Sequence, residues 1–133
     1  MYKTLLVNKS IEDGDKLVRR LEEKNFPISA AFWRYLDQEM LWRLVIVSPV
    51  VAQNGPLRTY IEVSKAVDEL GGSVQFGISD ITVMSPSSSQ FRDLRRTIEG
   101  AGVGRVRVAS SSEAHQGLAF EDFYLYRWDP NRL

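Results

Sequence analysis

The chain has 133 residues, of which 44% are hydrophobic and 26% are charged, as expected of one globular domain and not of a disordered chain. Its 17 basic and 17 acidic residues cancel, which disfavours the strongly basic class of dedicated nucleic-acid-binding proteins. There are no cysteines, which excludes disulfides, thiolate nucleophiles and cysteine-based metal sites and fits a reducing compartment.

The N-terminal segment contains an apolar run of only three residues, Leu5 to Val7, which is too short for the core of a signal peptide. No other stretch approaches the roughly 20 apolar residues that a membrane span requires. We therefore expect a cytoplasmic protein that makes no contact with a membrane.

The first predicted element is a helix over residues 11–24. Ser10 is a favourable N-cap, and apolar residues recur at helical spacing between Leu17 and Leu21. Pro27 follows the helix and prevents its continuation.

A β-hairpin is predicted next, with strands over residues 28–36 and 41–48 that are rich in aromatic and β-branched side chains. If the turn spans residues 37–40, Arg34 lies directly opposite Arg43 on the neighbouring strand. Like charges in that position destabilise a sheet, so an anion is expected beside the pair.

The rest of the chain alternates between helical and strand periods, and the ends of these elements are marked by proline, glycine and capping residues. In order, we predict a second helix between Pro56 and Gly71, a strand over 78–84, a third helix over 87–99 with Ser87 as its N-cap, and strands over 104–110 and 118–128.

The resulting order is α-β-β-α-β-α-β-β in a single domain over residues 1–133. We predict an α+β fold with a mostly antiparallel five-stranded sheet and helices packed on one face. The third strand, third helix and fourth strand are candidates for one parallel crossover. The predicted core comprises Leu17, Leu21, Leu44, Ile46, Ile61, Val67, Ile81, Val83, Leu94 and Ile98.

Three segments, residues 39–49, 78–86 and 121–127, resemble a family of small, uncharacterised bacterial α+β proteins with no assigned activity. The resemblance covers most of the chain beyond its first ten residues. It implies a bacterial or phage origin and implies nothing about mechanism.

The common catalytic and nucleotide-binding motifs are absent from the sequence, including the dinucleotide fingerprint, the Walker loop, the zinc-protease motif and the nucleophile elbow. The glycine-rich run over 100–104 follows a helix and precedes a strand, the reverse of a phosphate-binding loop. His115, the single histidine, is more simply an exposed loop residue than a catalytic base. We expect no cofactor, no metal and no catalytic residue, although enzymatic activity is left open.

Carboxylates near strands offer one route to catalysis. Asp80, Glu121 and Asp122 could hold magnesium and act with Lys65 as a nuclease, but the Glu-x-Lys spacing of the common nuclease core is missing. Outward-facing strand residues explain these acids more simply.

The candidate site is therefore the set of arginines interleaved with aromatic residues on the strands. This combination is typical of protein interfaces and of surfaces that stack on bases. The alternative is that the arginines pair with acidic side chains such as Glu39, Asp80 or Glu121 across the sheet. The candidate binding residues are Arg34, Tyr35, Trp42, Arg43, Tyr124, Tyr126 and Arg127.

The function that these observations favour is a non-enzymatic binding or adaptor module that acts through a protein–protein interface. We expect it to be a homo-oligomer or an accessory subunit of a bacterial or phage system. The alternative is a nuclease or a nucleotide-signal-binding protein that acts on a phosphate-bearing ligand.

Overall fold

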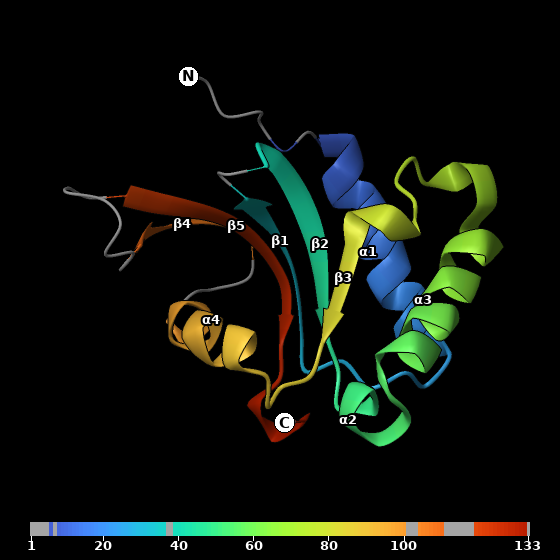
Figure 1. The fold of residues 1–133 in the computed structure, drawn as a ribbon. Helices are drawn as coiled ribbons and strands as arrows, with labels where there is room; N and C mark the ends of the chain where they lie inside the picture. Colours follow the sequence, from blue (N-terminus) through green and yellow to red (C-terminus); the bar gives the residue numbers. More distant parts are fainter. Residues whose placement is uncertain (1–5, 7, 37–38, 101–103, 111–118, 133) are drawn as a thin grey trace.

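The computed structural model describes residues 6, 8–36, 39–100, 104–110 and 119–132. The chain has an α+β fold in which one mixed sheet, ordered β3-β2-β1-β5-β4, lies between helices (Figure 1). The strands are β1 (Ala30–Leu36), β2 (Leu41–Val47), β3 (Ile81–Met84), β4 (Gly104–Ser110) and β5 (Ala119–Trp128). The helices are α1 (Asn8–Glu23), α2 (Val50–Asn54), α3 (Pro56–Leu70) and α4 (Ser89–Glu99), with short 3-10 turns at Gly71–Ser73, Ile78–Asp80 and Pro130–Arg132.

The parallel pair of the sheet is β2 with β3, and the other neighbouring strands run antiparallel. Parallel neighbours need a long crossover connection, which α2 and α3 supply here. The crossover that we predicted, from β3 through α4 to β4, is wrong because β3 and β4 lie at opposite edges of the sheet.

The hairpin of β1 and β2 has the register that the turn predicts. Arg34 faces Arg43, Tyr35 faces Trp42 and Leu36 faces Leu41. Met40, the last residue of the turn, has a left-handed backbone with a φ of 56°.

Helices cover both faces of the sheet, so the prediction that they pack on one face is wrong. α1 and α3 lie on one side, whereas α4 lies on the other (Figure 1). Alternate residues of a strand point to opposite faces. Ala31, Trp33, Leu44 and Ile46 therefore enter the core with α1 and α3, while Ala30, Phe32, Val45 and Val47 enter the core with α4.

The helix ends differ from the predicted ones in detail. α1 begins at Asn8, so that Ser10 lies inside the helix. After α1 ends at Glu23, the chain turns at Asn25, which has a φ of 60°; the amides of Asn25 and Phe26 donate to the carbonyls of Glu22 and Leu21 at 3.0 and 2.9 Å. This is the Schellman arrangement, with asparagine at the left-handed position that glycine usually occupies.

Two further helix ends differ. The sequence reasoning missed the short helix α2, which turns the chain between β2 and α3. α4 begins at Ser89, and its N-cap is Ser88, whose hydroxyl accepts a hydrogen bond from the amide of Phe91 at 3.2 Å. The predicted cap, Ser87, lies one residue too early.

The predicted core is buried except on α3. Ile61 is 47% exposed and Val67 is only partly buried, so the prediction for Ile61 is wrong. α3 instead turns Thr59, Val63 and Ala66 towards the sheet. Within the described part of the chain, no helix combines the length and apolar character needed to cross a membrane.

Candidate functional site

The sheet divides the predicted binding residues into two groups. Trp42, Tyr124 and Tyr126 pack against the core that contains α1 and α3. Arg34 and Arg43 lie on the opposite face, because each is a strand neighbour of a residue that points into the α1 core. The seven residues therefore do not form one site.

Tyr126 has a structural role. Its hydroxyl donates to the carbonyl of Ile11 at 2.6 Å and accepts from Nε1 of Trp33 at 2.9 Å. Burial raises the pKa of Tyr126 well above its usual value, so the phenol stays protonated. These bonds join α1 to β1 and β5, and they leave no hydroxyl free for a ligand.

The charge of Arg127 is balanced inside the molecule. Its Nε lies 3.2 Å from Oε2 of Glu22 and one terminal nitrogen lies 3.1 Å from Oε1, which is the two-pronged geometry of a guanidinium on a carboxylate. Tyr124 packs edge-on against Tyr126, with ring centroids 5.0 Å apart. Together with Ile11, Glu12 and Asp15 of α1, these residues line a shallow pocket of about 310 Å³.

Tyr35 and Trp42 form an edge-to-face pair, with ring centroids 5.4 Å apart. Tyr35 is buried and Trp42 is partly buried against the α1 core. Cross-strand aromatic pairs of this kind stabilise a hairpin. Much of the surface of the two rings is therefore covered by other residues of the chain.

The guanidinium of Arg43 is held in place by hydrogen bonds to β3. Its Nε donates to Oγ1 of Thr82 at 2.8 Å, and a terminal nitrogen donates to the carbonyl of Ile81 at 3.1 Å. Both acceptors are neutral, and no carboxylate of the described chain lies within ion-pair distance of Arg43. The guanidinium is thus held in place by β3 while its charge is not balanced by a described side chain.

Among the described residues, no helix lies over the part of the sheet that contains Arg43. α4 packs near the ends of β2, β3 and β5, whereas Arg43 is near the beginning of β2 and Arg34 is near the end of β1 (Figure 1). Leu41, two residues before Arg43 and therefore on the same face, is 40% exposed.

The acidic partners considered for the arginines can now be placed in part. Asp80 accepts a hydrogen bond from the amide of Gly77 at 2.9 Å and stabilises the 3-10 turn before β3. The side chains of Glu121 and Asp122, like the whole of His115, lie outside the described residues. In the part of the chain that is described, no group of three histidine or acidic side chains could hold a metal ion.

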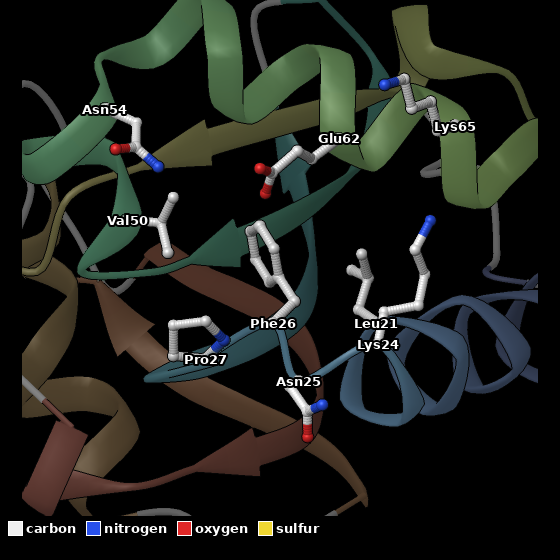
Figure 2. A pocket seen from close by; sticks show the side chains of 9 residues that line it. All are labelled: Leu21, Lys24, Asn25, Phe26, Pro27, Val50, Asn54, Glu62 and Lys65. Carbon is white, nitrogen blue, oxygen red and sulfur yellow. The ribbon is translucent and has the colours of Figure 1, made fainter.

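Sequence reasoning missed a cavity of about 410 Å³ between the end of α1, α2 and α3 (Figure 2). Apolar residues form part of its lining, and amide and charged side chains form the remainder. No motif could reveal it, because its walls come from three separate segments. The lining residues are Leu21, Lys24, Asn25, Phe26, Pro27, Val50, Asn54, Glu62 and Lys65.

Comparison of the chain with models of protein families, with curated proteins and with solved structures finds no match.

Proposed function

We propose that this chain is a non-enzymatic, cytoplasmic binding module that engages a protein partner through the uncovered end of the sheet around Arg43. The partner is either a second copy or a larger assembly of which this chain is an accessory subunit. The observation that carries the proposal is the fixed guanidinium of Arg43, which is partly buried and has only neutral acceptors among the described residues.

A preorganised arginine favours binding because its side-chain entropy is already lost. Arginine is enriched at the energetically important centres of protein interfaces, where its planar donors match a carboxylate in two-pronged fashion. Thr82 and Ile81 accept hydrogen bonds from only two of the three guanidinium nitrogens of Arg43. The remaining N–H groups can donate to an acidic side chain of a partner.

The surroundings of Arg43 fit a protein surface better than a free anion. Leu41 offers exposed apolar area on the same face, and Met40 in the turn is 45% exposed. An arginine beside apolar area resembles the core of an interface more than a site for a small, highly charged ligand.

A photo-crosslinking experiment tests the proposal. A benzophenone amino acid replaces Leu41 in the expressed protein, and the same substitution at Leu57 on α3 gives a control position that is also exposed. We expect a discrete protein adduct from position 41 that disappears when Arg43→Met is added. No adduct from position 41, or an adduct that is unaffected by Arg43→Met, contradicts the proposal.

Two simple measurements distinguish the kinds of partner. Size-exclusion chromatography with light scattering detects self-association and should respond to Arg43→Met if the partner is a second copy. An ultraviolet absorbance ratio raised by co-purified nucleotide, and restored to that of protein alone by Arg43→Met, would instead favour the phosphate-bearing ligand.

A further inference from the structure

The cavity between α1, α2 and α3 has a preformed apolar floor. Leu21, Phe26 and Val50 are 1%, 6% and 8% exposed and belong to the core. The Schellman turn at Asn25 fixes the backbone that carries Phe26. An apolar group that enters the cavity therefore meets side chains that are already ordered, which lowers the entropic cost of binding.

One of the two lysines that line the cavity is already paired. Nζ of Lys24 lies 2.6 Å from Oε1 of Glu69. The other carboxylate oxygen of Glu69 lies 2.9 Å from a terminal nitrogen of Arg20. The hydrogen bonds from Lys24 and Arg20 lower the pKa of Glu69. This network joins α1 to α3 and balances its own charge.

Glu62 and Lys65 are different. They lie three residues apart on α3, and neither side chain makes an ion pair or hydrogen bond with any described residue, including each other. Figure 2 shows the carboxylate of Glu62 directed into the cavity above the ring of Phe26. Glu62 is partly buried, and a partly buried carboxylate is stabilised by a cationic partner.

We propose that this cavity binds a small zwitterion with an apolar side chain, that is, an apolar amino acid or dipeptide. Glu62 receives the ammonium group, Lys65 receives the carboxylate, and the side chain lies on Phe26, Leu21 and Val50. The amide of Asn54, which Figure 2 shows at the rim, adds a neutral donor and acceptor. The volume of about 410 Å³ falls within the range of small-molecule sites.

The proposal follows from charge complementarity. A simple anion would be repelled by Glu62, and a simple cation would be repelled by Lys65. A purely apolar ligand would leave the partly buried carboxylate of Glu62 beside it with poorer access to water. A zwitterion satisfies both charges and uses the apolar floor.

Calorimetric and NMR titrations with L-leucine and leucyl-leucine test this inference on the full chain. We expect at least one probe to bind with a dissociation constant of about 1 mM or tighter and to shift the amide signals of Phe26 and Val50. Isoamylamine, which lacks the carboxylate, and 4-methylpentanoate, which lacks the ammonium group, should bind at least roughly tenfold more weakly.

Variants on a single helix provide the matched comparison. Glu62→Gln and Lys65→Gln should each weaken binding by roughly tenfold or more, while Asp68→Asn and Arg58→Gln, on the same helix but outside the cavity, should bind as the wild type does. Binding of neither zwitterion to the wild type overturns the inference. So does equal binding by the cavity and control variants. Arg43 does not line this cavity, so the result is independent of the function proposed for the sheet.

Discussion

Asp13 is a fully buried carboxylate that holds distant segments together. One of its oxygens accepts from the amide of Gln75 at 2.9 Å, and the other lies 2.8 Å from Nζ of Lys9. Lys9 and Lys16 also donate to the carbonyl of Ser73 at 3.0 and 3.1 Å. The cluster fastens the segment after α3 to α1.

Asp13→Ala should lower the free energy of unfolding by about 1–3 kcal/mol, because it leaves the amide of Gln75 without its acceptor and two lysines without their counter-charge. Urea denaturation followed by circular dichroism measures the change. Asp15→Ala is the control, since Asp15 pairs with Arg19 at the surface and should have little effect. Equal stability of the two variants would argue against a structural role for Asp13.

Tyr126→Phe removes one hydroxyl that serves two partners, Ile11 and Trp33, and should also lower the free energy of unfolding by about 1–3 kcal/mol. The raised pKa adds a pH dependence: the folded state holds the phenol proton more tightly, so stability is full below pH ~10 and falls as the pH rises above it. Denaturation at neutral and alkaline pH, with Tyr124→Phe as control, measures both effects. An alkaline loss of the same size in Tyr126→Phe as in the wild type would contradict this assignment.

The positions of candidate-site residues could be predicted from the sequence only where a short turn determines them. The four-residue turn fixed Arg34 opposite Arg43. The roles of Tyr126 and Arg127 were not predictable, because their partners Ile11 and Glu22 lie 115 and 105 positions away in the chain. No strand or helix pattern reports such contacts.

Secondary-structure elements follow sequence patterns closely, but the faces that they bury follow from packing. The apolar runs Ala30–Trp33 and Leu44–Val47 are buried at every position. Continuous burial of a strand indicates cover on both of its faces, and that signal predicts helices on both sides of the sheet. On α3, the stripe through Thr59, Val63 and Ala66 is buried, whereas Leu57 and Ile61 are exposed.

The contact between α1 and β5 depends on the absence of a side chain at Gly14. A Cβ atom there would clash with the hydroxyl of Tyr126 and lie 2.8 Å from Nε1 of Trp33. Gly14→Ala should therefore destabilise the protein by a few kcal/mol even though alanine favours helices, because overpacking typically costs about 1–3 kcal/mol. Gly72→Ala is the control, since nothing lies within 4 Å of the added atom. A Gly14→Ala protein that melts at or above the wild-type temperature would show that α1 can shift without cost.

At the scale of the whole molecule, the sheet separates two cores of different composition. One side joins α1 and α3 to the sheet, and the other joins α4 to the sheet. The α+β class was evident from the alternation of periods. The position of β3 beside β2 could not be predicted from the sequence. Strand pairing depends on which apolar surfaces pack together, and the sequence of one strand does not specify the strand it pairs with.

The two cores share every central strand, which leads us to predict that they unfold together. Leu94 of α4 is 5% exposed and packs in the second core. Leu94→Ala should lower stability by about 2–5 kcal/mol through the lost contacts and the cavity left behind. Phe32 and Val45 of this core adjoin Trp33 and Leu44 of the other along the same strands, so loosening one face removes support from the other.

The tryptophans provide reporters for both sides. Trp128 contacts Phe91 of α4, with ring centroids 5.8 Å apart, whereas Trp33 lies in the core with α1. The double variant Trp33→Phe/Trp42→Phe leaves Trp128 as the only tryptophan, and Trp128→Phe leaves Trp33 and Trp42, which both lie on the side of α1. In the Leu94→Ala background, both reporters and far-ultraviolet circular dichroism should give one coincident thermal transition, shifted downward by several degrees. If the Trp128 signal changes at a lower temperature than the Trp33 signal, α4 melts as a separate unit, and the shared strands do not couple the two cores.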